Sequence, residues 1–125
     1  MLNFLLVAIG GAAGSMLRYA TGLGATRLFG PGFPWGTLIV NVTGSFVIGV
    51  FVESIARRFG ASEPVRLLLV TGFLGGFTTF SSFSLDAAAL IERGALGHAA
   101  LYVGGSVLLS LGAVFAGLAV ARAVL

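Results

Sequence analysis

The run of apolar residues from Val65 to Leu90 is long enough to cross a bilayer, but a glycine pair and a group of hydroxyl residues interrupt it near its middle. As a continuous helix it would measure about 39 Å at about 1.5 Å per residue, which exceeds a hydrocarbon core of about 30 Å. Gly75 and Gly76 each cost roughly 1 kcal/mol in a helix relative to Ala, and the hydroxyls that follow compete for backbone hydrogen bonds. We therefore predict a local unwinding from Gly75 to Thr78.

A break at this depth limits where the segment can lie. Irregular backbone is tolerated within a membrane only where it is buried in protein or lines a polar cavity. The break is therefore interpreted as a functional interruption of a transmembrane helix. A close helix crossing that needs small residues is the alternative, and composition does not decide between them.

The composition is that of a multi-pass membrane protein, because 58% of the 125 residues are hydrophobic and only 9% are charged. The net charge of +3 comes from arginines scattered at the ends of apolar segments, which argues against a nucleic-acid partner. The chain has no cysteine and one histidine, so disulfides and ordinary Cys/His zinc sites are excluded.

Apolar segments predict an all-α membrane protein, a single domain over residues 1–125 in the cell (inner) membrane. The start of the chain lacks the basic residues of a signal peptide, so it is expected to be retained as the first span. Residues 21–34 contain glycines and prolines and are expected to form a connector. The four expected spans are Leu2–Tyr19, Trp35–Ile55, Val65–Leu90 and Ala99–Val120.

The arginines are divided almost equally between the two predicted ends of the bundle. One end has Arg57, Arg58, Arg66 and Arg122, and the other has Arg18, Arg27 and Arg93. A strong difference in the number of arginines would fix the orientation of the chain in the membrane, whereas a difference of one does not. The balance therefore favours insertion in both orientations and an antiparallel homodimer, with a weakly biased single topology as the alternative.

Two predicted helices each have a stripe of polar side chains, because residues four apart share one helix face. Stripes that face each other would line a path without carboxylates, which favours an anion or a neutral solute over a cation. Alternatively, each hydroxyl bonds back to its own helix. The stripes are Thr37, Asn41 and Ser45 in the second span, and Tyr102, Ser106 and Ser110 in the fourth.

Phenylalanines follow the predicted break at intervals of three residues, as Phe77, Phe80 and Phe83. Their usual role is packing or contact with lipid. The alternative role depends on the positive edge of the ring, which attracts an anion without fixing it as an arginine would.

Three other classes of function are less favoured by the sequence. Ser82, Asp86 and His98 are residue types of a hydrolytic triad, but no G-x-S-x-G motif is present and His98 lies at a membrane boundary, so an enzyme is not expected. A proton-coupled exporter normally needs an ionisable group at mid-depth, and the acidic residues fall toward the span ends. Such an exporter of small solutes is the second hypothesis, and a purely structural membrane dimer is the third.

Three motifs resemble the Fluc family of fluoride channels, also called CrcB, over essentially the whole chain. They are GGAAGSMLRY at 10–19, GTLIVNVTGS at 36–45 and GFLGGFTTFSSFS at 72–84. The family often has Thr where Ser82 stands, and both residues carry a hydroxyl. The resemblance implies a dual-topology homodimer in the lipid bilayer that conducts fluoride passively and protects the cell from it.

The resemblance also implies roles for individual residues. Gly75 and Thr78 would supply backbone carbonyls to a structural, non-transported Na+ at the dimer centre. Arg18 ends the first motif, with a packing or vestibule role. The implied pore residues are the phenylalanines Phe80 and Phe83, the amide of Asn41, and the hydroxyls of Tyr102, Ser106 and Ser110.

Overall fold

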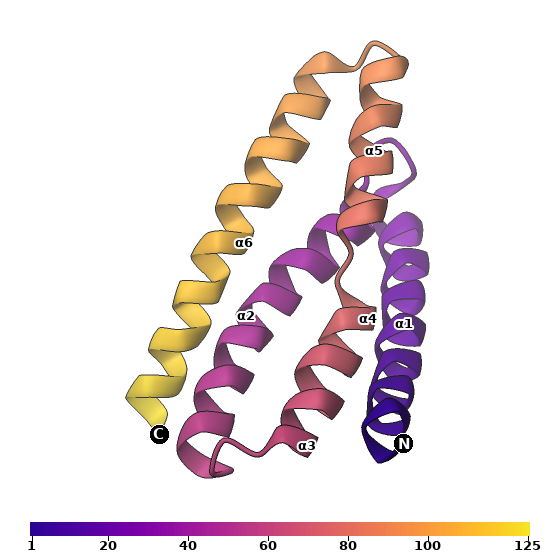
Figure 1. Ribbon diagram of the computed structural model, residues 1–125. Helices are drawn as coiled ribbons and strands as arrows, with labels where there is room; N and C mark the ends of the chain where they lie inside the picture. Colours follow the sequence, from indigo (N-terminus) through magenta and orange to yellow (C-terminus); the bar gives the residue numbers. More distant parts are fainter.

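Helices account for nearly the whole chain, because the apolar stretches have no proline in a helix interior. All three prolines lie in a loop or at the start of a helix. The computed structural model describes residues 1–125 (Figure 1). Its elements are α1 (Leu2–Phe29), α2 (Trp35–Arg58), α3 (Glu63–Arg66), the π-helix η1 (Leu67–Leu74), α4 (Gly75–Phe77), α5 (Phe80–Glu92) and α6 (Leu96–Val124).

The first helix is longer than predicted and replaces most of the expected connector. It continues past Tyr19 to Phe29 and ends at Gly30, whose φ of 78° is accessible mainly to glycine. Hydropathy marks the part of a helix that lies in lipid, whereas Thr21 and Arg27 are compatible with further helical turns. The connector between α1 and α2 is therefore residues 30–34, and Arg18 lies well inside α1.

The other spans are also extended by their flanking residues. The second ends at Arg58 instead of Ile55, and the fourth runs from Leu96 to Val124. Four segments are long and apolar enough to cross a membrane when α3 to α5 are taken together as Glu63–Glu92. The chain is a multi-pass membrane protein.

The third span is broken, as predicted, but the break lies slightly later than expected. Gly75 to Phe77 remain helical, and the extended residues are Thr78 (φ −90°, ψ 160°) and Thr79 (φ −156°, ψ 125°). Threonine suits extended backbone because its side chain is β-branched. Gly76 serves close packing instead, since a Cβ there would lie 2.5 Å from the Gly11 carbonyl oxygen.

Glycines bring several pairs of helices into backbone contact, including α1 with α2, where a Cβ at Gly36 would lie 2.9 Å from the Gly22 Cα. A Cβ at Gly14 of α1 would overlap the Phe73 carbonyl of η1, and one at Gly117 of α6 would overlap the Phe46 carbonyl of α2. Helix faces made of such small residues allow the two backbones to approach closely and make dispersion contacts. The bundle therefore consists of α1 packed on η1 and α4, and α2 packed on α6, with α5 crossing to the far end of α6 (Figure 1).

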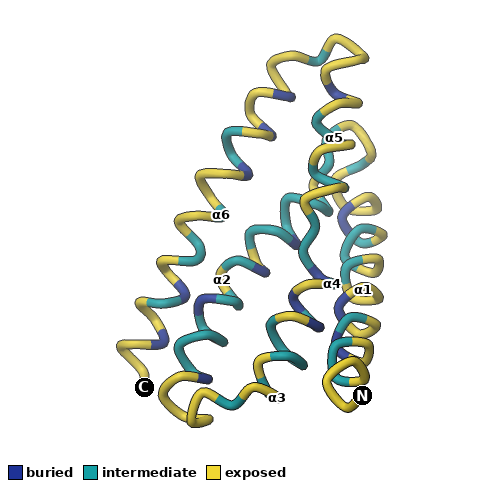
Figure 2. Tube along the Cα trace, viewed as in Figure 1, coloured by how far each residue is buried: buried dark blue, intermediate teal, exposed yellow.

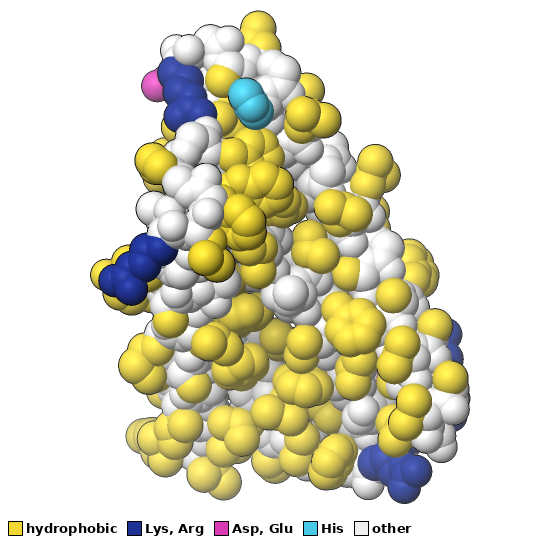
Figure 3. Space-filling model, turned by 180° about the vertical axis from the view of Figure 1, so that it is seen from behind, with side chains coloured by type: hydrophobic (Ala, Val, Ile, Leu, Met, Phe, Trp, Pro, Cys, Tyr) yellow, Lys and Arg dark blue, Asp and Glu magenta, His cyan; other side chains and the backbone are white.

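The outside of the bundle is apolar, as expected for contact with lipid. Exposed residues follow the outer faces of α1, α5 and α6 (Figure 2), and hydrophobic side chains cover most of the face seen from behind (Figure 3). The buried core is small and divided into a cluster around Val40, Leu74 and Phe77 and a cluster around Leu90, Ala99 and Tyr102.

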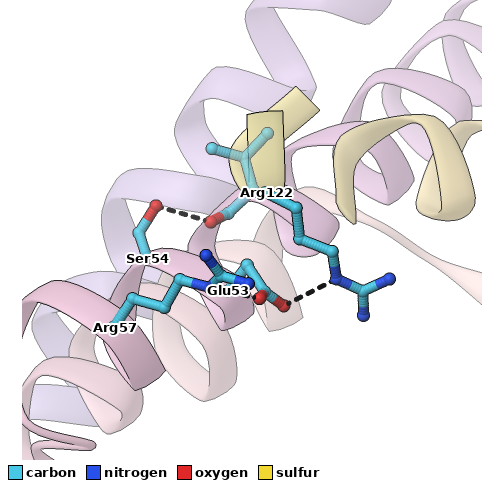
Figure 4. A network of polar contacts seen from close by, with 5 residues as sticks. Glu53, Ser54, Arg57 and Arg122 are labelled. Carbon is cyan, nitrogen blue, oxygen red and sulfur yellow. Dashed lines mark hydrogen bonds and ion pairs between the residues drawn. The ribbon is translucent and has the colours of Figure 1, made fainter. Parts of the chain in front are cut away.

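One ion-pair network joins α2 to the C-terminal end of α6. The Glu53 carboxylate accepts a hydrogen bond from Arg57 Nε at 2.7 Å and lies 3.4 Å from Arg122 Nε (Figure 4). Both arginine side chains are about half exposed, so screening limits the contribution of each pair. The network links α2 to α6 at this end of the bundle.

Candidate functional site

The break in the third span is stabilised by the side chain of Asn41 from α2. Asn41 Oδ1 accepts a hydrogen bond from the Thr79 amide at 2.8 Å, and Nδ2 donates to the Thr79 carbonyl at 2.9 Å. Asn41 therefore satisfies both backbone groups of a residue that has left the helix. Gly44, one turn further along α2, makes room for this approach, because a Cβ there would overlap the methyl group of Thr78.

Three other hydrogen bonds between a side chain and the backbone lie around the break. Arg18 Nε donates to the Gly76 carbonyl at 3.0 Å, so this arginine holds the break from α1. Thr79 Oγ1 caps α5 by accepting from the Ser82 amide at 3.0 Å. Thr78 Oγ1 donates to the Leu74 carbonyl at 2.8 Å.

The break leaves the carbonyls that precede it without their helical donors, and those of Gly75 and Thr78 are among them. In a continuous helix the Gly75 carbonyl would pair with the Thr79 amide, which here donates to Asn41. Likewise, the Thr78 carbonyl would pair with the Ser82 amide, which here donates to Thr79. The chain has no group of three or more His, Cys, Asp or Glu side chains that could hold a metal ion.

A groove of about 390 Å³ lies beside the break and is open on one side. It brings together seven of the eight predicted site residues, with Tyr102 as the exception. None of the groove residues is ionisable. The lining, called here the central groove, consists of Asn41, Gly44, Ser45, Ile48, Val70, Leu74, Gly75, Thr78, Thr79, Phe80, Phe83, Ser106 and Ser110.

The serine at the centre of the α6 stripe has an unused hydrogen-bonding group. Ser106 is 5% exposed, and its Oγ has no hydrogen-bond partner. An unpaired buried hydroxyl is costly unless a ligand or water bonds to it. Ser106 therefore brings an unpaired hydroxyl to the wall of the central groove.

Phe80 and Phe83 lie together in the groove, whereas Phe77 belongs to the core. The rings of Phe80 and Phe83 are 5.6 Å apart and tilted by 44°, and Phe80 is 78% exposed. Phe77 is buried and stacks on Phe73 at 5.9 Å. The spacing of three thus includes one packing residue and two groove residues.

Tyr102 does not line the groove but packs against Phe83, which does. It is fully buried, its ring lies 5.2 Å from that of Phe83, and its hydroxyl donates to Asp86 Oδ2 at 3.1 Å. The expectation of a path without carboxylates holds for the central groove, but it is wrong at Tyr102. Asp86 is two turns from the first residue of α5, and the tertiary fold brings it to the α6 stripe.

Sequence reasoning missed the contact of Arg18 with the break. The available signal was a basic residue close to the glycines of an apolar helix, but the early end predicted for the first span placed it at the membrane boundary. With Arg18 inside the bundle, Arg27 and Arg93 are the arginines left at that end.

Comparison with known proteins identifies relatives over the full length of the chain. A family model described as "CrcB-like protein, Camphor Resistance (CrcB)" matches residues 5–118. The chain is 63% identical over 123 residues to a protein of Rhizobium etli named "Fluoride-specific ion channel FluC", with 98% of each chain covered. Proteins with the same name from Agrobacterium fabrum and Chelativorans sp. are 62% and 54% identical, with 98% and 100% of each chain covered.

Proposed function

This chain belongs to the CrcB family, and from that premise we propose that it is a channel that conducts fluoride passively and selectively across the cell membrane. The proposal takes its ion from the names of the relatives. The observation that supports it most directly is the central groove, which has hydroxyls, an amide and phenyl rings but no ionisable side chain. Such a channel lowers cytoplasmic fluoride whenever the gradient is outward, and it is not an enzyme.

Two kinds of groove residue would replace the water molecules that hydrate the ion in solution. Ser106 and Ser110 donate hydrogen bonds along α6, and the ring edges of Phe80 and Phe83 add a weak positive potential. Conduction requires binding that is favourable enough to admit the ion and weak enough to release it. Neutral donors in series meet this requirement better than a fixed arginine.

Asn41 is assigned a supporting role in this pathway. It lines the groove, but both polar atoms of its amide are bonded to Thr79. It therefore shapes the wall of the pore and keeps the break in place, while the serines supply the free donors.

We further propose that the working unit is an antiparallel homodimer. In one chain the central groove is open, and Gly75 and Phe80 are exposed beside it. A second copy would cover this face and complete two pores. Because the basic residues at the two ends are now Arg57, Arg58, Arg66 and Arg122 against Arg27 and Arg93, the proposal rests more on the open face than on charge.

A Na+ ion fits the break of the same dimer. The Gly75 and Thr78 carbonyls have lost their helical donors, and two from each chain would make a site with four oxygens. No carboxylate lines the groove, so a monovalent hard cation suits it better than Ca2+ or Mg2+. Bound there, Na+ would supply a fixed positive charge near both anion paths.

Fluoride efflux from liposomes that contain the purified protein tests the function. A channel should release fluoride down its gradient without a proton gradient and should exclude chloride. Dependence on a proton gradient would favour the exporter, and absence of flux would favour a structural dimer. Accessibility labelling of the 57–66 loop from both sides of the membrane tests dual topology, and labelling from one side alone would contradict it.

A further inference from the structure

A second cavity lies beyond Tyr102, under the loop that joins α1 to α2. It has a volume of about 340 Å³ and is called here the loop cavity. The loop forms one side, and Thr37, Asp86 and Arg93 contribute polar groups to the others. Thr37 belongs to the same α2 stripe as Asn41 and Ser45, which line the central groove. The two cavities therefore follow one another along α2.

Tyr102 lies between residues that line the two cavities. Its neighbour one turn along α6, Ser106, lines the central groove, and its hydroxyl donates to Asp86, which lines the loop cavity. A solute that follows the α6 stripe past Ser106 therefore meets Tyr102 next and the loop cavity after it.

Phe33 of the loop covers Tyr102 from outside. The edge of one ring points at the face of the other, with centroids 5.5 Å apart and planes at 89°. The Phe33 ring also lies 6.0 Å from that of His98 at the start of α6. In this position of the loop Tyr102 has no exposed surface, so this end of the path is closed.

Arg93 holds the loop against α5. Its guanidinium donates to the Gly32 carbonyl, and no carboxylate lies within ion-pair distance of it, because the ion pairs of the chain are those of Glu53 with Arg57 and Arg122. Arg93 is seven residues after Asp86 and lines the same cavity. Arg93 and Asp86 therefore place one charge of each sign at the wall of the loop cavity, and neither side chain takes part in an ion pair.

The loop has the composition of a hinged segment. Gly30 has a φ of 78°, and a Cβ at Gly30 or Gly32 would meet nothing within 4 Å. Pro31 and Pro34 restrict their own φ angles, so rotation is concentrated at the two glycines. In Figure 1 this loop lies beside α5, and directly after it Gly36 of α2 packs against Gly22 of α1, where a Cβ at Gly36 would lie 2.9 Å from the Gly22 Cα.

From these contacts we propose that the loop cavity is the outer chamber of the anion path and that residues 30–34 are its lid. The lid opens when Phe33 leaves Tyr102 and Arg93 releases the Gly32 carbonyl. In the open state, the Arg93 guanidinium is free to attract the anion, while the Asp86 carboxylate of the same chamber accepts a hydrogen bond from the Tyr102 hydroxyl. This inference rests on the proposed channel function.

A zinc bridge tests whether the lid must move during conduction. Phe33→His places a second imidazole beside His98, where a ring separation near 6 Å suits two nitrogens that each bind zinc at about 2.0 Å. Micromolar Zn2+ should stop fluoride efflux in this variant, and a chelator should restore it. The wild-type chain and the double variant Phe33→His, His98→Ala should not respond.

The zinc experiment overturns the proposal in two ways. If Zn2+ binds to Phe33→His with one ion per chain and efflux continues, the lid does not gate the path. If Zn2+ does not bind, Phe33 and His98 are not side by side in the closed lid. Loss of efflux from the wild-type chain without zinc would instead contradict the channel function.

Cysteine labelling measures lid opening without any flux. The chain has no cysteine, and Leu90 lines the loop cavity while being 2% exposed, so Leu90→Cys reports access to the chamber. Adding Arg93→Met should accelerate its reaction with a methanethiosulfonate reagent roughly tenfold, as expected for loss of one charged hydrogen bond. Arg58→Met, at the other end of the bundle, should leave the rate unchanged. An unchanged rate with Arg93→Met would contradict the lid.

Discussion

Asn41 and Thr79 are joined by two hydrogen bonds, one from the Thr79 amide and one to the Thr79 carbonyl. Through this pair, α2 determines where the third span is broken. The glycines that precede the break remain helical, so the partner on another helix matters more than local flexibility.

Substitution of Asn41 should therefore reduce the stability of the fold more directly than it reduces fluoride flux. Asn41→Ala leaves two backbone groups of Thr79 unpaired, at a cost of roughly 2–4 kcal/mol. Asn41→Asp keeps an acceptor for the Thr79 amide but adds negative charge to the groove, so it should retain more stability and still lose fluoride flux. Thermal unfolding in detergent and liposome efflux measure the two effects. Equal stability of Asn41→Ala and the wild-type chain would contradict this role.

Arg18 should contribute to stability through its hydrogen bond to the backbone next to the break. Arg18→Met keeps the length of the side chain but removes the donor to the Gly76 carbonyl, with an expected loss of about 1.5–3 kcal/mol. Arg58→Met removes the same charge at an end of the bundle and should be close to neutral. Comparison of the two unfolding midpoints checks this, and similar midpoints would show that the Arg18 contact contributes little.

Glycines of α6 should separate into two classes under substitution by alanine. Gly117→Ala forces a Cβ against the Phe46 carbonyl, and overpacking of this kind costs about 1–3 kcal/mol. Gly112→Ala meets nothing within 4 Å and should be neutral or gain up to about 1 kcal/mol of helix propensity. Unfolding midpoints that do not differ would mean that α2 and α6 are not in backbone contact.

An aliphatic side chain should substitute for either groove phenylalanine in packing but not in fluoride conduction. Phe80→Ile and Phe83→Ile keep an apolar side chain and remove the ring quadrupole, so fluoride efflux should fall at least about tenfold while the protein stays folded. Phe77→Ile is a matched control, because Phe77 lies in the core and should alter stability more than flux. Full flux in both groove variants would assign the rings to packing.

The sequence was sufficient to predict the helical segments, the broken third span and the two polar stripes, because each depends on hydropathy or on spacing along one helix. It was insufficient where the outcome depends on a neighbour. The extended residues are Thr78 and Thr79 because Asn41 lies opposite them, and Tyr102 is buried because Phe33 and Phe83 pack on it. The end of α1 was misplaced because helix formation continues beyond the apolar stretch.

Removal of sodium tests the last link between the break and the dimer. The Gly75 and Thr78 carbonyls are the two whose helical donors are used elsewhere, and in a dry interface each would cost several kcal/mol if left unpaired. Replacement of Na+ by a large organic cation should therefore loosen the dimer and reduce fluoride flux together. Because the ligands are backbone atoms, Thr78→Ser should preserve both properties, whereas Gly75→Val should weaken both by placing bulk at the exposed side of the break. Undiminished flux and an unchanged dimer after exhaustive exchange of Na+ would assign these carbonyls to water instead.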